Sequence, residues 1–353
     1  MLWHIGIDEA GYGPILGPFV MTAVAIGSRL PMSADDFWHH LPRVCRNYAA
    51  SQNKATKSDE ALFWVVDSKQ LHRGDQALAR LEYHTLPALW PWVGRTRRLG
   101  TLLRCLRAAK ITGLQLPCYR VVGRVLPLCH PAETIAARAT LWQEMFTCAE
   151  LTFLPPRVVV FLPQTINQLL ERHGTKAALP LEALRHLLPA ILNDIAALER
   201  RAPLSIDIAA AGEHPVEYEV VCDRLGGRVC YATVLTAVLE GWQLQSYRES
   251  PACCEYLWTS RSAEGRQPSP RQRLRFVITP CAESQAFAVA LASMMSKYLR
   301  EVFMDFWNEY WQQQVPHVRP TAGYWTDGER FLRAIRPAYV RLGLPESALR
   351  RFR

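Results

Sequence analysis

The chain has 353 residues, of which 49% are hydrophobic and 21% are charged. This length suits one large domain or two ordinary ones, and the composition excludes disordered, collagen-like and coiled-coil proteins. No run of 18 or more uncharged apolar residues occurs, and the opening MLWHIGIDEAG lacks the basic start and apolar middle of a signal peptide. We therefore expect a soluble, cytoplasmic protein that does not span a membrane.

The net charge is +9, from 41 basic and 32 acidic residues. Of the basic residues, 35 are arginine, which binds phosphate in a two-pronged geometry. The ten cysteines include no C-x-x-C pair and no partnered histidine spacing, so a zinc site is unsupported. The charge keeps nucleic acid among the candidate partners.

The first third of the chain predicts a hairpin followed by helices. Residues 2–8 alternate as in a strand and end at the turn Gly11-Tyr12-Gly13-Pro14, and residues 19–26 predict the returning strand. A short buried strand over 63–66 ends at Asp67-Ser68-Lys69. The mainly helical region 75–110 carries a basic stretch, formed by Arg95, Arg97, Arg98, Arg104 and Arg107.

The rest of the chain mixes strands and helices. We predict strands over 119–128, 158–162 and 216–222, and helices over most of 132–200. Apolar residues recur every three or four positions over 284–313, which predicts a long amphipathic helix. This mixture indicates an α/β or α+β architecture that is typical of enzymes.

Four acidic residues lie where predicted strands or helices begin or end. Asp8 and Glu9 precede a glycine turn, Asp223 ends a strand before a second glycine-bearing turn, and Glu283 precedes the long helix. Carboxylates gathered at strand ends suit hard cations such as Mg²⁺ or Mn²⁺. Two such ions activate a water and stabilise the leaving oxygen of a phosphodiester. Adjacent acids near a turn are also commonly just solvated.

The order of the motifs resembles one known family. Residues 7–14, IDEAGYGP, followed by Gly17-Pro18, resemble the opening of the type 2 ribonucleases H, best the bacterial ribonuclease HII branch. Residues 66–71, VDSKQL, resemble its D-S-K-x-L element, and Glu283-Ser284 with Lys297, 14 residues after Glu283, resembles its D-S…K helix. Residues 323–326, GYWT, resemble its G-Y-x-T element, and residues 350–352 its basic-aromatic ending.

The resemblance implies an α/β, RNase H-like fold, with a mixed central β-sheet flanked by helices. It implies hydrolysis of the RNA strand of RNA/DNA hybrids, or of ribonucleotide-containing duplexes, with two divalent cations, Mg²⁺ or Mn²⁺. Carried over, Asp8, Glu9 and Glu283 are three of the four catalytic, metal-binding carboxylates. The fourth is Asp223, with Asp207 as its rival.

The same resemblance implies the substrate contacts. Gly11 and Gly13 would bring backbone amides to the 2′-hydroxyl, which distinguishes RNA from DNA. Ser68 and Lys69 would hold a phosphate, and Tyr324 would pack beside the sugar or base. Lys297 is a further phosphate contact or else part of the solvated helix face.

The chain departs from the family pattern in several places. Tyr12 stands where the family has Arg or Lys, and as a substrate contact it would stack or hydrogen-bond in place of the cation. Glu283 stands where the family has Asp. We expect one catalytic domain over 1–353 with insertions at 130–205, helical, and at 241–279, strands and a basic loop. The helical insertion would pack around the core or act as a clamp. Because of Tyr12, a nuclease for structured DNA or RNA stays an alternative, as does a non-catalytic hybrid-binding protein.

Overall fold

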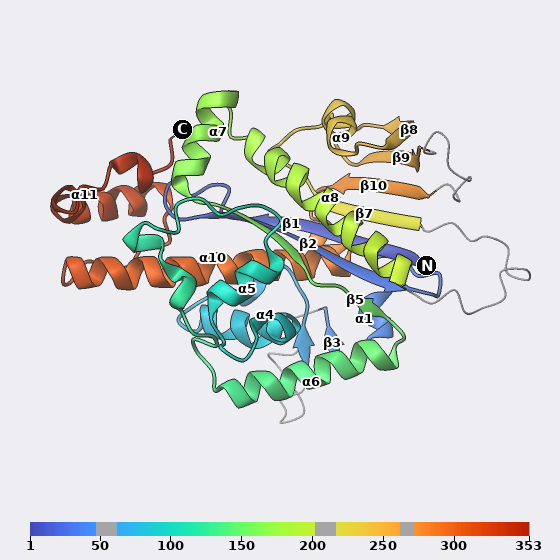
Figure 1. The fold of residues 1–353 in the computed structure, drawn as a ribbon, viewed down its shortest axis with the longest axis horizontal. Coiled ribbons are helices and arrows are strands. Elements are labelled where there is room, and N and C mark those ends of the chain that lie inside the picture. Colours follow the sequence, from blue (N-terminus) through green and yellow to red (C-terminus); the bar gives the residue numbers. More distant parts are fainter. Residues whose placement is uncertain (47–61, 202–216, 262–271, 353) are drawn as a thin grey trace, which may run out of the picture.

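The structure is a computed structural model that describes residues 1–46, 62–201, 217–261 and 272–352. Its centre is a mixed eight-stranded sheet in the order β5-β2-β1-β7-β10-β9-β8, with β6 also paired to β2 (Figure 1). The strands are β1 Leu2–Ala10, β2 Phe19–Ser28, β5 Thr152–Phe153, β6 Arg157–Phe161, β7 Glu217–Asp223, β8 Trp242–Arg248, β9 Cys254–Ser260 and β10 Arg273–Thr279. A separate small sheet pairs β3 Val44–Cys45 with β4 Phe63–Trp64. The predicted α/β class, a mixed sheet flanked by helices, is confirmed.

Helices cover both faces of this sheet (Figure 1). On one face α10 crosses β1 and β2, with α4 and α6 outside it, and on the other α8 crosses β2 and β6 beside α7 and α9. The helices are α1 Phe37–His40, α3 Ser68–Leu71, α4 Ala77–Val93, α5 Leu99–Leu106, α6 Ala132–Cys148, α7 Pro163–His173, α8 Ala178–Arg201, α9 Ala232–Val238, α10 Phe287–Gln314 and α11 Trp325–Arg341. Short 3-10 turns are η2 Pro117–Tyr119, η3 Val121–Gly123, η4 Ala282–Ser284 and η5 Glu346–Ala348.

The alternation predicted for the first strand divides its side chains between the two layers. Trp3, Ile5 and Ile7 belong to the apolar core under α7 and α8. On the opposite face, a Cβ atom at Gly6 would lie 2.1 Å from the carbonyl carbon of Ala288, so glycine lets α10 lie directly on the strand. This close approach brings the first turns of α10 to the end of β1 that carries Asp8.

Most predicted elements are confirmed, with shifted ends. The hairpin is β1 and β2, the strands over 158–162 and 216–222 are β6 and β7, and the long helix is α10, which begins only at Phe287 because η4 precedes it. The strand predicted over 119–128 is wrong. Within that segment Tyr119 ends η2 and residues 121–123 form η3, because Pro127 lacks an amide donor for a ladder and Gly123 weakens a strand.

The two predicted insertions correspond to recognisable parts of the structure. Residues 130–201 form α6, α7 and α8, and they also supply β5 and β6 to the edge of the main sheet. Residues 241–261 form the hairpin β8–β9, which extends the sheet beyond β10. That these segments are insertions relative to the family stays a prediction. Within the described ranges, no helix is both long and apolar enough to cross a membrane.

Candidate active site

Three parallel strands end at one edge of the sheet, and the predicted acids lie there. β7 pairs in parallel with β1, with Ile7 opposite Cys222, and β10 pairs in parallel with β7, with Thr279 opposite Asp223. Asp8 and Asp223, which follow Ile7 and Cys222, therefore lie side by side on neighbouring strands. Glu283 follows β10 in η4, immediately before α10. The register thus brings acids that are 275 residues apart in sequence (8 to 283) to one place.

Asp8 is buried between β1 and α10, with only 7% of its surface exposed. Ser293 of α10 donates a hydrogen bond to its side chain. The Ser293 hydroxyl also lies 3.1 Å from the Ser68 hydroxyl, so one serine links Asp8 to the D-S-K element. Burial first, and then the negative charge of Glu9, raise the pKa of Asp8 well above its usual value.

The other acids share this electrostatic field. Burial, followed by the charge of Asp223, raises the pKa of Glu9 from 4.5 to about 7. Burial likewise raises the pKa of Glu283, and Asp223 and Asp67 add to the effect. Each of these shifts has the sign expected when carboxylates are brought together out of water.

Three carboxylate oxygens at this edge are buried and lack a hydrogen-bond partner among the described residues. They are Glu9 Oε2, Asp223 Oδ1 and Glu283 Oε2. Buried polar atoms are normally paired, so orphaned atoms that come from three different elements and meet at one edge require an explanation. A bound cation would supply it.

Lys69 supplies positive charge beside the acids. Asp67 caps α3 by accepting a hydrogen bond from the Lys69 amide, and Lys69 Nζ lies 3.9 Å from both Asp67 Oδ2 and Glu283 Oε1. Burial alone would lower the pKa of Lys69, but Asp67, Glu283, Asp8 and Asp223 together raise it. Its side chain is 78% exposed, so the ammonium can also reach a ligand.

The glycine turn after Glu9 adjoins the predicted G-Y-x-T element. The amides of Ile15 and Leu16 donate to the Gly323 carbonyl at 2.8 and 3.2 Å. A Cβ atom at Gly13 would lie 3.9 Å from Tyr324 Cε1, so these two residues are neighbours. No described residue accepts a hydrogen bond from the amides of Gly11, Tyr12 or Gly13. The turn therefore offers amide donors and an exposed aromatic ring to a ligand.

Two buried arginines support this turn from below. Gly11 has φ +87°, and a Cβ atom there would lie 2.7 Å from Arg300 Nε. Arg351 donates to the carbonyls of Gly11, Pro14 and Gly17 at 2.5 to 3.1 Å. Tyr12 points elsewhere, because a Cβ atom at Gly226, in the turn after β7, would lie 3.0 Å from its hydroxyl.

Lys297 lies on α10 but forms an ion pair with Glu301, which is not one of the four predicted metal-binding acids. Its Nζ atom lies 2.9 Å from Glu301 Oε1, and Arg300 Nη1 lies 2.8 Å from the same oxygen. Burial would raise the pKa of Glu301, but a hydrogen bond from His72 and the two cations hold it well below its usual value. With 15% of its side chain exposed, Lys297 is largely committed to this pair.

The oxygen ligands of these carboxylates suit a hard cation, although their side chains do not yet surround a single point. Among the described residues, no three His, Cys, Asp or Glu side chains already surround a point where a metal ion would be held. The donor set is nevertheless entirely oxygen, and three of its atoms are buried without a partner. Such a set suits Mg²⁺ or Mn²⁺. We take the residues to fit, with side-chain rotation needed to close the shell.

Sequence reasoning and structure differ in which residues complete the site. Asp67 lies within residues 66–71 and Ser293 lies between Glu283 and Lys297, but the spacing of these motifs does not predict that Ser293 contacts Asp8 or that Asp67 contacts Lys69. Arg351 lies in the basic-aromatic ending, and only the fold brings it to the glycine turn. Asp207, the rival of Asp223, lies outside the described residues.

No family model matches the chain, and no curated protein matches it in sequence. Among solved structures, it is similar to ribonuclease HII of Archaeoglobus fulgidus, solved in complex with PCNA, at 14% identity and a TM-score of 0.39 over 99% of this chain and 94% of that one. It is also similar to ribonuclease H2 of Pyrococcus horikoshii OT3, at 13% identity and a TM-score of 0.38 over 98% of this chain and 92% of that one. A third similar structure is Bst ribonuclease HIII in complex with Mn²⁺, at 16% identity and a TM-score of 0.38 over 99% of this chain and 66% of that one.

These structures are ribonucleases of the family that the sequence motifs resemble. Because the identities lie below 25% and the TM-scores below 0.5, the likeness alone does not decide what this chain does. The function has to be inferred from the site.

Proposed function

We propose that this protein is a metal-dependent endonuclease that hydrolyses the RNA strand of RNA/DNA hybrids. The observation that carries the proposal is the set of orphaned, buried oxygens on Glu9, Asp223 and Glu283 beside Asp8. Together with Asp8, these residues would hold two divalent cations, Mg²⁺ or Mn²⁺. When bound, such ions activate a water molecule for attack on phosphorus and stabilise the leaving sugar oxygen.

The chain's own residues would bind and orient the phosphodiester. Lys69, which is exposed and within 3.9 Å of Glu283, is placed to attract a phosphate toward the acids. Ser68 is linked to Asp8 through Ser293, so the phosphate contact and the acid are fixed to the same turn of α10. The carboxylates repel the substrate unless cations neutralise them, which makes activity dependent on the metal.

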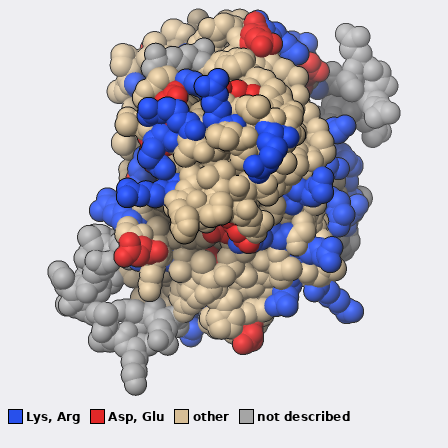
Figure 2. All heavy atoms as spheres, turned by 90° about the vertical axis from the view of Figure 1, so that its left-hand side faces the viewer, with Lys and Arg blue, Asp and Glu red and all other residues tan. Residues whose placement is uncertain are grey.

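The glycine turn supports the choice of a ribose-containing substrate. Its three unbonded amides are donors that a 2′-hydroxyl can satisfy, and Tyr324, which is 54% exposed, lies beside Gly13 to pack against the adjacent sugar. A duplex is long enough to extend over the neighbouring surface. On the face that carries α11, Lys and Arg side chains outnumber Asp and Glu (Figure 2), and Arg333, Arg336 and Arg341 of α11 are exposed.

Tyr12 favours keeping a second candidate, a nuclease for structured DNA or RNA. The hydroxyl of Tyr12 lies against Gly226 and supplies no positive charge where the family has a cation. Discrimination between ribose and deoxyribose would then depend on the amides alone.

Cleavage of three labelled duplexes by the purified protein with Mg²⁺ or Mn²⁺ tests the proposal. One is an RNA/DNA hybrid, one is DNA with a single ribonucleotide, and one is all-DNA. We expect cutting only where ribose is present, and none by Asp8→Asn, which should still bind the hybrid. Cutting of all-DNA would favour the second candidate. Unchanged turnover in Asp8→Asn would overturn the active-site assignment, and binding without cutting by the wild type would leave a hybrid-binding protein.

A further inference from the structure

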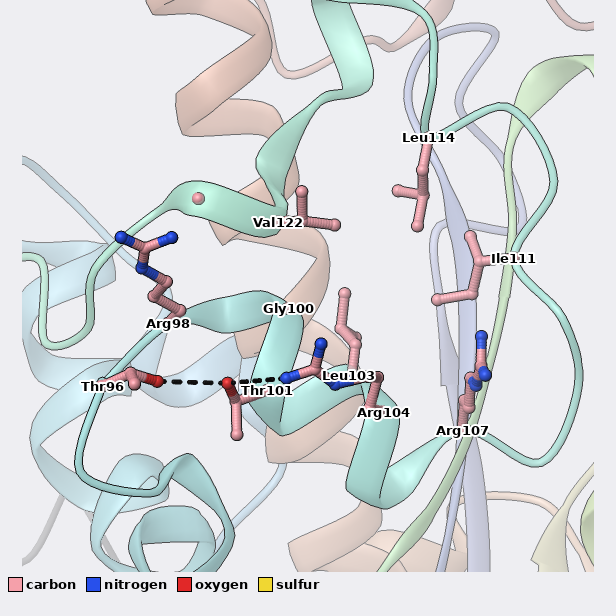
Figure 3. A pocket seen from close by; sticks show the side chains of 11 residues that line it. Thr96, Arg98, Gly100, Thr101, Leu103, Arg104, Arg107, Ile111, Leu114 and Val122 are labelled. Carbon is pink, nitrogen blue, oxygen red and sulfur yellow. Dashed lines mark hydrogen bonds between the residues drawn. The ribbon is translucent and has the colours of Figure 1, made fainter.

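A pocket of about 720 Å³ lies on α5, and none of the acids at the carboxylate edge lines it. Arg98, Arg104 and Arg107 are spread along one edge of it, Val122 and Leu114 lie on the other side, and Ile111 lies next to Arg107 (Figure 3). None of the described residues that line it is acidic. The pocket is formed by the basic stretch that the sequence shows and that the proposed active site does not use.

The three arginines are not neutralised by the protein. No carboxylate of the described residues pairs with any of them. Arg104 is fixed through a hydrogen bond of 3.3 Å from Nη2 to the Thr101 hydroxyl, which in turn lies 3.2 Å from the Thr96 hydroxyl. Three exposed guanidinium groups without a carboxylate partner are therefore available to an anionic ligand.

The lining matches the chemistry of a nucleotide unit. Planar guanidinium groups bind phosphate oxygens in pairs, and the opposite wall offers apolar surface for the face of a base. The hydroxyls of Thr96 and Thr101 lie on the arginine side, near Arg104 (Figure 3). The volume falls within the ordinary range of small-ligand sites, roughly 300–1,000 Å³.

The surroundings favour a polymer over a free nucleotide. Val122 is 41% exposed, and all three arginines are exposed, so the ligand would remain open to solvent. Further exposed cations, Arg95, Arg97 and Lys110, flank the pocket in sequence. A continuous positive surface follows a phosphate backbone, whereas a single nucleotide needs only a local charge.

We propose that this pocket binds one unpaired nucleotide of a nucleic-acid strand, with its phosphates on Arg98, Arg104 and Arg107. The inference rests on the proposed function only in taking nucleic acid as the ligand. It is tested by binding without divalent metal, so an inactive protein leaves the test intact, and its failure leaves the proposed cleavage standing.

The test is fluorescence anisotropy of a labelled single-stranded DNA 12-mer in EDTA at several salt concentrations. The pocket variant is R98A/R104A/R107A, and the matched control is R172A/R200A/R201A, which removes three exposed arginines from α7 and α8. We expect the pocket variant to bind at least 10-fold more weakly at low salt and to lower the salt slope by roughly 2, at about 0.7 per phosphate contact. The control should change affinity less than twofold.

A second variant keeps every arginine. Val122→Asp places an acid on the exposed wall, and we expect a similar loss of oligonucleotide affinity with an unchanged melting temperature. Equal losses in the pocket and control variants would show that only net charge matters and would overturn the proposal. Unchanged oligonucleotide binding in the pocket variant would also overturn the proposal. If that variant binds the oligonucleotide normally but has lost binding of labelled ATP, the pocket is instead a site for a free nucleotide.

Discussion

Arg351, near the C-terminus, donates a hydrogen bond of 2.5 Å to the carbonyl of Gly11, two residues after Glu9. The same guanidinium also binds the carbonyls of Pro14 and Gly17, and only 2% of the residue is exposed. These bonds turn the carbonyls of the glycine turn inward. The turn's amides are thereby left available on the side of the substrate.

Arg351→Ala should therefore damage both stability and cleavage. It leaves several buried carbonyls without a donor, which we expect to lower the free energy of unfolding by about 3 kcal/mol or more. Arg350→Ala is the control, because the partly exposed Arg350 side chain pairs with Glu329 and Glu346 and lies over the Trp325 ring, contacts worth at most about 1 kcal/mol each. Thermal melting of both variants checks this, and equal losses would contradict the role given to Arg351.

Two alanine substitutions distinguish a glycine that the fold of the turn requires, Gly11, from one that contacts the substrate, Gly13. At Gly11, φ is +87° and a Cβ atom would meet the Pro18 carbonyl at 2.5 Å, so Gly11→Ala should unfold the turn and cost more than about 2 kcal/mol. At Gly13 the nearest atom is 3.9 Å away, so Gly13→Ala should change stability by less than about 0.5 kcal/mol. We nevertheless expect Gly13→Ala to cleave the hybrid roughly 10-fold more slowly. Full activity in Gly13→Ala would argue against a substrate contact there.

The raised pKa of Glu9 makes stability fall with pH in the absence of metal. The folded protein retains a proton on Glu9 up to about pH 7, whereas the unfolded chain releases it near 4.5, so the stabilisation present below 4.5 is lost as the pH rises through 7. Glu9→Gln removes this penalty. In EDTA it should gain on the order of 1 kcal/mol at pH 7.5 and nothing at pH 4.

The control for Glu9→Gln is a substitution that should change stability at pH 7.5 in the opposite direction. A hydrogen bond from His4 lowers the pKa of Glu219, so Glu219→Gln should destabilise the protein at pH 7.5. Melting curves at the two pH values provide the comparison. If Glu9→Gln melts at the same temperature as the wild type at both, Glu9 is not held in a repulsive group.

Paired substitutions decide whether Asp223 or Asp207 completes the set of four carboxylates. Asp223 ends β7 beside Asp8, and its buried Oδ1 lacks a partner. We expect Asp223→Asn to lower the rate of hybrid cleavage by at least about 10³-fold, and Asp207→Asn to leave it within about twofold. The reverse pattern in single-turnover assays would transfer the role to Asp207.

The sequence predicts the site better than it predicts the residues that support it. Asp8, Asp223 and Glu283 were marked by their positions at the ends of elements, and parallel pairing of β1, β7 and β10 is enough to gather them. The order of the motifs predicts the turn and Tyr324, which the fold places beside Gly13.

What could not be predicted depends on long-range packing. Ser293 reaches Asp8 only because Gly6 lets α10 lie on β1, and Arg351 reaches Gly11 from 340 residues away. The strand predicted over 119–128 is wrong for a local reason: Tyr119, Val121 and Leu126 are buried, but Val122 and Val125 are exposed and Pro127 has no amide for a ladder.

Mn²⁺ binding to the wild type and to Asp8→Asn tests the central claim most directly, because it does not require turnover. The free Mn²⁺ signal is followed by electron paramagnetic resonance, with Asp75→Asn as a control that removes an exposed acid. We predict that the wild type and Asp75→Asn each bind about two ions per chain, and that Asp8→Asn loses at least one. Equal binding by all three proteins, or none by the wild type, would contradict a metal site on these carboxylates.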